Sequence, residues 1–261
     1  MLDKNMISRT VELLSTAELE RKELVRITEN YPNLNIEEAY EIQENLVEQK
    51  VEEGYRILGA KMGLTSRAKM EQMGVDEPIY GYVFDYMAIS NGELHLNKYI
   101  HPKVEAEIAF VLGQDIEGPD VTRADVLSST DYVLPALEII DSRYKDFKFT
   151  LSDVIADNAS SSGVIFGNQM HRPDKIELDL VGTTLNINGE IKDLGAGAAV
   201  LGHPADSVAM LANMLSRKGK KLKKGDIILS GAITSAIMLT AGDSVLAKFD
   251  ELGTVEFVVK E

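Results

Sequence analysis

From residue 55 onward the chain is a succession of short β-type runs with few helical segments between them. The runs occupy 56–64, 104–112, 132–141, 163–167, 180–194, 226–233, 243–249 and 254–259. Within 180–194, the pair Asn188-Gly189 is a strong hairpin signal. A parallel sheet would need a helix after most strands, and this chain has too few. We therefore expect a mixed α+β fold built around a closed or strongly curled sheet.

The first 54 residues have a helical pattern instead. Apolar residues recur at helical spacing between Ile7 and Tyr31, which predicts one long or two short amphipathic helices. A further helix is predicted from Asn35, a good N-cap, to Gly54, a typical C-terminal cap. Peripheral helices are expected at 66–74 and 203–219. We expect an N-terminal helical part, 1–54, joined to a β-rich catalytic domain, 55–261, in one continuous body.

Composition excludes several classes of function. The net charge of −15 repels phosphate backbones and anionic lipid, so nucleic acid is not an expected partner. The chain has no Cys, which rules out disulfides and leaves His and oxygen atoms as metal ligands. No uncharged apolar run reaches the roughly 20 residues needed to cross a bilayer, and residues 1–25 lack a signal-peptide pattern. We expect a cytoplasmic protein that does not bind a membrane.

Two glutamates lie within the apolar run VEAEIAF at 104–110. Alternate residues of a strand share a face, so Glu105 and Glu107 point one way while Val104 and Ala106 point the other. By the same periodicity, Glu138 in VLPALEII falls on an interior face. Three acidic side chains on two strands suit a hard divalent ion, Mg²⁺ or Mn²⁺.

A simpler interpretation of these acids is also open. Glu105 and Glu107 can lie on the solvent side of an edge strand, with Glu138 paired to a lysine or an arginine. Spacing alone does not decide between this arrangement and a metal site.

Two other segments carry candidate functional residues. Lys61 is the only charge in the Gly-rich run GAKMGLT, where a depressed pKa would suit it to donate a proton or bind an oxyanion. The alternative is a lysine that extends from a strand end into solvent. The segment ADNASSSG at 156–163 brings together Asp157, Asn158, Ser160 and Ser161 in a predicted loop at a helix end, and its alternative is an ordinary turn.

Several blocks resemble a known enzyme family. The blocks at 59–87, 101–112, 131–144, 156–161 and 195–215 are similar, in order and spacing, to the 2-oxo-3-hexenedioate (4-oxalocrotonate) decarboxylases of aromatic meta-cleavage pathways. These enzymes are similar to the 2-hydroxypenta-2,4-dienoate hydratases, and both groups belong to the fumarylacetoacetase-like superfamily. The resemblance implies a mixed β-roll with peripheral helices and a bound divalent ion, usually Mg²⁺.

The resemblance also implies roles for particular residues. It makes Glu105, Glu107 and Glu138 the metal ligands, places Lys61 in the active site, and puts Ser160 and its loop near the substrate carboxylate. We expect four further residues to contact substrate, namely Asp157 and Ser161 in the loop and the apolar residues Leu64 and Ile79. Leu64 and Ile79 would form an apolar region around the leaving carboxylate.

One departure from the hydratase pattern favours decarboxylation. Hydratases typically have P-D-F-G where this chain has PIYG at 78–81, so Ile79 replaces an acid, and an apolar side chain cannot transfer a proton. The expected reaction is decarboxylation of 2-oxo-3-hexenedioate to 2-hydroxypenta-2,4-dienoate and CO2.

Two other functions remain open at this point. One is hydration of 2-hydroxypenta-2,4-dienoate, and the other is a non-catalytic scaffold that binds an enzyme through the N-terminal helices. The resemblance further implies a homo-oligomer and a complex with a partner hydratase.

Overall fold

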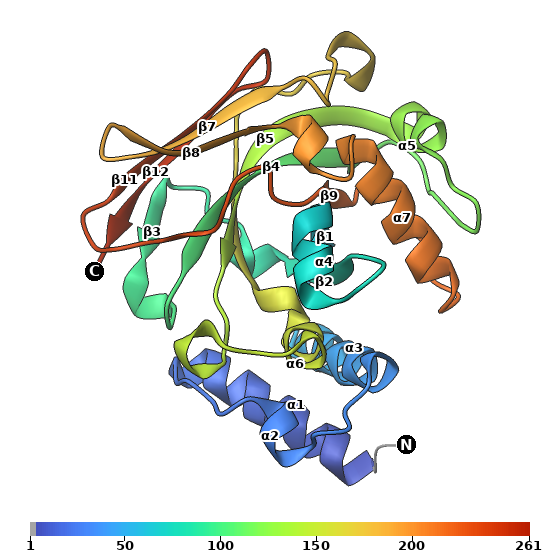
Figure 1. The fold of residues 1–261 in the computed structure, drawn as a ribbon, viewed down its shortest axis with the longest axis vertical. Coiled ribbons are helices and arrows are strands. Elements are labelled where there is room, and N and C mark those ends of the chain that lie inside the picture. Colours follow the sequence, from blue (N-terminus) through green and yellow to red (C-terminus); the bar gives the residue numbers. More distant parts are fainter. Residues whose placement is uncertain (1–3) are drawn as a thin grey trace.

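The computed structural model describes residues 4–261 (Figure 1). Its helices are α1 Lys4–Glu20, α2 Ile27–Asn30, α3 Ile36–Glu52, α4 Arg67–Met73, α5 Arg123–Ser129, α6 Leu151–Ala156 and α7 Pro204–Ser216. Its strands are β1 Ile57–Gly63, β2 Ile79–Phe84, β3 Glu93–His95, β4 Lys103–Leu112, β5 Thr130–Ile140, β6 Ser161–Phe166, β7 Gly182–Ile187, β8 Glu190–Ala196, β9 Ile227–Leu229, β10 Ile237–Met238, β11 Ser244–Phe249 and β12 Gly253–Lys260. Within the described part of the chain, every helix is too short or too polar to span a bilayer.

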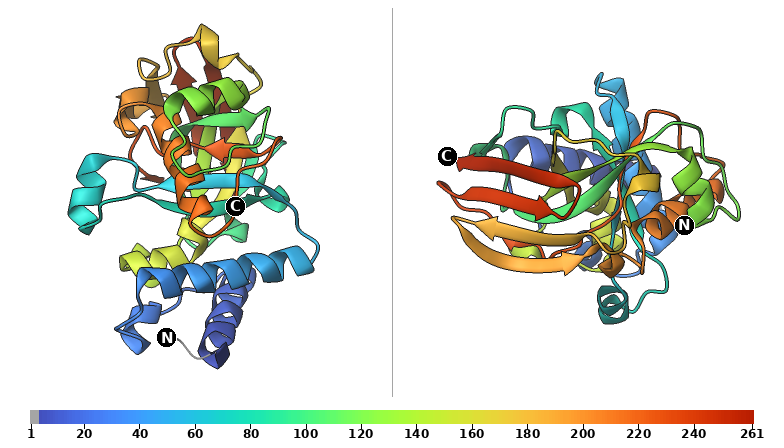
Figure 2. Two further views of the ribbon diagram at one scale, coloured as in Figure 1. Left: turned by 90° about the vertical axis from the view of Figure 1, so that its right-hand side faces the viewer. Right: turned by 90° about the horizontal axis from the view of Figure 1, so that it is seen from above.

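The N-terminal segment is helical, as predicted. The side chain of Asn35 accepts a hydrogen bond from the backbone N–H of Glu38, and Glu38 reaches back in a capping box. Gly54 follows the helix with φ +100°, a conformation that glycine adopts without steric cost. Helix α3 packs between α1 and α6, which places the N-terminal helices against one end of the β-structure (Figure 2, left).

Seven strands form the larger sheet, in the order β2-β1-β9-β4-β5-β6 with β10 added beside β4. The sheet is mixed: β1 pairs parallel with β9, and the other neighbours are antiparallel. It curls strongly, because β2 also contacts β6 from the opposite end of the order. The predicted curled sheet is therefore confirmed.

A second sheet of five strands, β3-β12-β11-β7-β8, packs beside β4, β5 and β6. Its β7–β8 hairpin turns at Asn188 and Gly189, whose φ angles of +55° and +82° match the predicted two-residue turn. Helices α5 and α7 pack together beyond the opposite end of the larger sheet (Figure 1).

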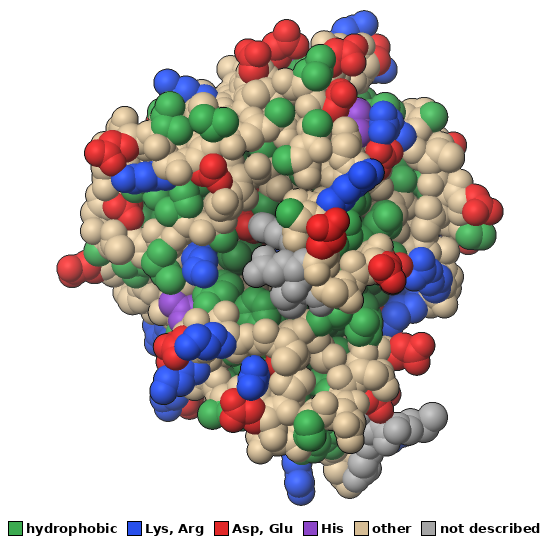
Figure 3. Space-filling view, in the orientation of Figure 1, with side chains coloured by type: hydrophobic (Ala, Val, Ile, Leu, Met, Phe, Trp, Pro, Cys, Tyr) green, Lys and Arg blue, Asp and Glu red, His purple; other side chains and the backbone are tan. Residues whose placement is uncertain are grey.

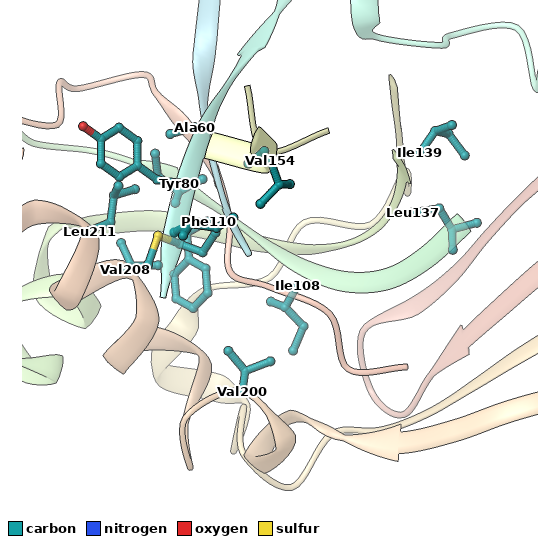
Figure 4. Close-up of a cluster of buried hydrophobic side chains, with 14 of the residues drawn as sticks. Ala60, Tyr80, Ile108, Phe110, Leu137, Ile139, Val154, Val200, Val208 and Leu211 are labelled. Carbon is teal, nitrogen blue, oxygen red and sulfur yellow. The ribbon is translucent and has the colours of Figure 1, made fainter. Parts of the chain in front are cut away.

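The two faces of β4 and β5 bury different sets of side chains. The convex face carries Ile108 and Phe110 from β4 with Leu137 and Ile139 from β5, all in the main apolar core, where Val208 and Leu211 of α7 also lie (Figure 4). The concave face carries a smaller apolar cluster and three acidic side chains. That cluster comprises Val47, Val83, Phe84, Met87, Ala109, Leu134, Ala136, Val164 and Leu229.

The structure contains several elements that were not expected from the sequence. Strands β2, β3 and β10 and helix α5 were not predicted, only the end of α6 was expected, and the run at 226–233 is a strand only over 227–229. The strands are short and lack a long periodic pattern, whereas α5 and α6 each begin with a capping box, at Thr122 and Thr150, which is a local sequence signal. Figure 3 shows acidic and basic side chains interspersed over the face seen in Figure 1, with a hollow near its centre.

Candidate metal and catalytic site

The three predicted acidic residues converge on the concave side of the curled sheet. Glu105 and Glu138 are directly opposite one another in the β4–β5 register, and Glu107 lies two residues along on the same face. One carboxylate oxygen from each lies within 4.8 Å of the others. Glu105 is 7% exposed and the other two are completely buried. The predicted alternation and the interior position of Glu138 are confirmed.

The buried oxygens are only partly satisfied by hydrogen bonds. Glu107 Oε2 accepts from the backbone N–H of Gly231 at 2.7 Å. Among the described residues, no hydrogen-bond donor reaches Glu107 Oε1 or Glu138 Oε1. Glu138 Oε2 lies 3.1 Å from Lys61 Nζ. The edge-strand interpretation of Glu105 and Glu107 is therefore wrong, because β4 is paired on both sides, although Glu138 does pair with a lysine.

Burial of several like charges shifts the pKa values of the carboxyl groups. Burial, reinforced by Glu138, raises the pKa of Glu107 well above its usual range. Burial also raises the pKa of Glu138 to about 7, although Lys61 opposes this shift. Without a cation, the site therefore retains protons near neutral pH.

Lys61 departs from its predicted electrostatics. Burial lowers its pKa, but the three surrounding carboxylates outweigh burial, so the pKa is raised rather than depressed. Its ammonium group also donates a hydrogen bond to the carbonyl oxygen of Ala159 at 3.2 Å. Lys61 is 3% exposed, so the alternative of a lysine extending into solvent is wrong as well. In the structure, Lys61 is a buried, charged hydrogen-bond donor.

Glycines on β1 and β2 leave space around Lys61. Lys61 pairs with Gly81, and Gly63 pairs with Ile79, so these four residues share the concave face. A Cβ on Gly63 would lie 3.1 Å from Ile79 Cγ1 and 3.7 Å from Lys61 Nζ. The structure thus brings Ile79 close to Lys61. Leu64, with φ +58°, follows directly at the end of β1 and packs partly buried against the core.

The segment after α6 contributes the remaining predicted residues. It is a loop at a helix end, as predicted, and its residues point in different directions. Ser160 Oγ is buried without a hydrogen-bond partner among the described residues. Ser161 Oγ contacts Met87 Sδ at 3.7 Å, and the Asp157 carboxylate is held by Arg143. Ser160 therefore has a buried hydroxyl without a partner among the described residues, whereas the side chains of Asp157 and Ser161 have other contacts.

The donor set fits a hard divalent ion. If all groups are ionised, three buried carboxylates face the single positive charge of Lys61, which leaves two negative charges uncompensated. The unpartnered oxygens of Glu107 and Glu138 supply ligand atoms of the kind that such ions prefer.

Three participants in the site were not singled out from the sequence. They are the Gly231 backbone N–H, the Ala159 carbonyl and the Arg143 side chain. The first two are backbone groups, which carry no residue-type signal. Arg143 lies shortly after β5, the strand that carries Glu138. An arginine so close to the end of an apolar strand was the sequence signal that could have identified it.

Comparison with known sequences assigns the family. Residues 55–260 match the family described as fumarylacetoacetate (FAA) hydrolase C-terminal, which is most of the chain. The chain belongs to the fumarylacetoacetate hydrolase family. This assignment agrees with the curled sheet, and residues 55–260 contain all three acidic residues and Lys61.

Individual members of the fumarylacetoacetate hydrolase family are similar over nearly the whole length. A 4-oxalocrotonate decarboxylase from Pseudomonas putida is 44% identical, with 97% of each chain covered. A 2-keto-4-pentenoate hydratase from Paraburkholderia xenovorans is 40% identical, covering 90% of this chain and 87% of the hydratase. The structure of 4-oxalocrotonate decarboxylase from Pseudomonas putida G7, complexed with magnesium and adipate, superposes with a TM-score of 0.97 at 41% identity and covers 99% of each chain.

Proposed function

We propose that this chain is a metal-dependent carboxy-lyase that converts 2-oxo-3-hexenedioate (4-oxalocrotonate) to 2-hydroxypenta-2,4-dienoate and CO2. The main structural support is the convergence of three buried carboxylates beside a charged lysine. The 44% identity to a 4-oxalocrotonate decarboxylase over 97% of both chains supports the choice of reaction. The substrate is accordingly a small 2-oxo dicarboxylic acid of an aromatic meta-cleavage pathway.

Glu105, Glu107 and Glu138 would hold Mg²⁺, with Mn²⁺ as the alternative. When bound, the ion would act as a Lewis acid that favours negative charge on the 2-oxo oxygen of the substrate. The magnesium in the similar decarboxylase structure from Pseudomonas putida G7 supports this choice of metal.

Lys61 would donate a hydrogen bond or a proton as negative charge develops on the substrate. Its raised pKa keeps it protonated at neutral pH, and its contacts with Glu138 and Ala159 fix the direction of the ammonium group. Ser160, buried and without a partner among the described residues, would donate to the substrate carboxylate. Asp157 and Ser161 support this loop in our proposal.

Ile79 and Leu64 would surround the carboxylate that leaves as CO2. Apolar side chains solvate a charged carboxylate poorly, but neutral CO2 does not need such solvation. This environment therefore favours the departure of the carboxylate as CO2. Ile79 lies on the same face as Lys61 and is 5% exposed.

Hydration of 2-hydroxypenta-2,4-dienoate is the second candidate, favoured by the 40% identity to a 2-keto-4-pentenoate hydratase. Ile79 argues against it, because an apolar side chain cannot transfer a proton to or from water. Purified protein with Mg²⁺ should be assayed on both substrates. CO2 release from 2-oxo-3-hexenedioate is the expected result, and turnover of the dienoate alone would replace decarboxylation with hydration.

The remaining proposals concern the assembly. We propose a homo-oligomer located in the cytoplasm that associates with a 2-hydroxypentadienoate hydratase, so that the unstable dienol passes directly between the enzymes. Sedimentation of the protein alone and mixed with such a hydratase tests both statements. A monomer that does not change its sedimentation in the mixture would contradict them.

A further inference from the structure

The turn between α6 and β6 has an unusual backbone. Asn158, Ala159 and Ser160 have φ angles of +49°, +51° and +57°, so three successive residues with a Cβ adopt the left-handed conformation. This conformation is sterically unfavourable for Ala159 and Ser160, although asparagine tolerates it better, and such runs persist only where surrounding contacts fix them. The contacts that fix this turn therefore help to identify its role in the protein.

Arg143 holds the turn at both ends. Its backbone N–H donates to Asp157 Oδ2 at 3.0 Å, and its Nε donates to the other carboxylate oxygen. Its Nη2 donates to the Asp157 carbonyl at 2.6 Å, and its Nη1 donates to Ser162 Oγ at 2.9 Å. Arg143 is 4% exposed and Asp157 is completely buried. One planar guanidinium thus joins the residue before the turn to the strand after it.

Asn158 ties the same turn to β2. Its side chain accepts from the Tyr82 N–H at 2.8 Å and donates to the Tyr82 carbonyl at 2.9 Å. The Asn158 carbonyl lies over Gly81, where a Cβ would approach it to 2.4 Å. Because Gly81 is the strand partner of Lys61, the turn lies directly beside the lysine.

The turn carries one polar group that contacts Lys61 and a second that has no hydrogen-bond partner among the described residues. The Ala159 carbonyl accepts the hydrogen bond from Lys61, and Ser160 Oγ is buried without a partner among the described residues. The carboxylate of Asp157, in contrast, points back to Arg143.

We propose that Arg143 and Asp157 are positioning residues: their ion pair fixes the left-handed turn that aims the Lys61 ammonium through the Ala159 carbonyl and places the Ser160 hydroxyl. This inference rests on the proposed function for the reaction in which Lys61 acts, and it assigns Asp157 a supporting role instead of substrate contact. Both residues act through Lys61 and Ser160, so their loss lowers kcat while leaving metal binding intact.

The test is Arg143→Lys, made both in the wild-type chain and in a Lys61→Met chain. Lysine keeps the charge but cannot bridge Asp157 and Ser162 together. In the wild-type background we expect kcat to fall by about 10- to 100-fold, as expected when a reacting group is misplaced by a fraction of an ångström. KM for 2-oxo-3-hexenedioate should also rise, because Ser160 is proposed to bind the substrate carboxylate, whereas the affinity for Mg²⁺ alone, measured by calorimetry, should be unchanged.

In the Lys61→Met background the same substitution should lower kcat by a smaller factor than in the wild-type background, because only the part of its effect that passes through Ser160 remains. A purely structural defect would lower kcat equally in both backgrounds, and that result would overturn the proposal, as would an unchanged kcat in Arg143→Lys. Arg123→Lys, at the exposed Arg123–Asp206 pair, is the matched control and should have wild-type activity.

A second variant covers the case in which Arg143→Lys does not fold. Ser162→Ala removes the Nη1 partner and the hydroxyl contacts with the carbonyls of Asp141 and Ser160, and it should lower kcat by a smaller factor with the same constant Mg²⁺ affinity. All rates refer to whichever reaction the wild-type protein catalyses, decarboxylation or hydration, so a change of substrate leaves this test standing. A wild-type protein that catalyses neither reaction overturns the proposed function and this inference together, whereas additive losses overturn this inference alone.

Discussion

Burying the carboxylate of Glu107 carries a large desolvation cost. It is completely buried, and only one of its carboxylate oxygens accepts a hydrogen bond from the described chain. Glu107→Gln removes the charge while keeping the shape. Mg²⁺ affinity should fall by about 100-fold or more, because a ligand is lost, while the metal-free protein should keep close to wild-type stability, because the raised pKa of Glu107 already leaves its carboxyl group protonated near neutral pH.

Calorimetric titration with Mg²⁺ and thermal unfolding without metal measure the two effects. Glu190→Gln, at a side chain on β8 that is 75% exposed, is the control and should change neither quantity. Unaltered Mg²⁺ affinity in Glu107→Gln would remove this residue from the metal site.

Glu138 makes metal binding depend on pH. Its pKa of about 7 in the folded, metal-free protein means that Mg²⁺ must displace a proton below this pH. Mg²⁺ affinity should therefore rise with pH by up to about 10-fold per pH unit for each proton displaced, one from Glu138 and a second from Glu107, whose pKa is also raised. Titrations at pH 6, 7 and 8 in buffers of different ionisation enthalpy count the protons released, and a pH-independent affinity would contradict this account.

The same shift has a consequence for stability, with a defined sign. Between the ordinary value of 4.5 and about 7, the folded metal-free chain binds more protons at Glu138 than the unfolded chain does. Glu138 therefore makes the metal-free protein less stable as pH rises through this interval.

Lys61 can be separated from metal binding by substitution. Lys61→Met should lower kcat by about 100-fold or more, since a positioned donor is lost. Mg²⁺ affinity should be equal or higher, because a positive charge next to the ligands is removed. Lys148→Met, at an exposed side chain, serves as the control. A loss of Mg²⁺ affinity in Lys61→Met would indicate that the substitution disturbs the whole site.

At the residue scale, the positions of the site residues could be predicted from the sequence better than their pKa shifts. The two-residue period of a strand suffices to place Glu105 and Glu107 on one face, so their convergence was foreseeable. The pKa shift of Lys61 was not, because it depends on carboxylates from β4 and β5 that only the curl of the sheet brings to β1.

At the scale of elements, Gly81 on β2 makes room for the turn that contacts Lys61. Gly81→Ala should destabilise the protein by about 1–3 kcal/mol, because the new Cβ would meet the Asn158 carbonyl at 2.4 Å. It should also lower kcat, since the turn must move. Gly182→Ala, where a Cβ meets nothing within 4 Å, is the matched control. Urea denaturation and steady-state rates measure both effects, and a Gly81→Ala protein with wild-type stability and rate would contradict the close packing described here.

Elements with strong local signals were predicted correctly, and short ones were missed. Helix α3 has its own N-cap and C-terminal glycine, and the β7–β8 hairpin has its own turn residues, so each is specified locally. Helix α6 has only six residues, and β10 has two. Strand β10 depends on its packing partners, which a single sequence does not reveal, whereas α6 begins with a capping box of Thr150 and Asp153 that the sequence does contain.

At the scale of the whole molecule, the N-terminal helices are part of the same body as the sheet. Gln43 of α3 donates hydrogen bonds to the carbonyls of Tyr80 in β2 and Ile155 in α6, and both bonds are buried. Through these contacts α3 supports both the strand that carries Ile79 and the helix that precedes the Asn158 turn. The proposed boundary between 1–54 and 55–261 therefore separates two structural regions that are tightly packed.

The central claim is that three carboxylates on the concave face hold a divalent ion on which decarboxylation depends. The most direct test is the turnover of 2-oxo-3-hexenedioate before and after dialysis against a chelator, followed by addition of Mg²⁺. We expect the rate to fall by at least about 100-fold on dialysis, as loss of several kcal/mol of transition-state stabilisation implies, and to recover with Mg²⁺. Full turnover in the chelator-treated protein would contradict the account.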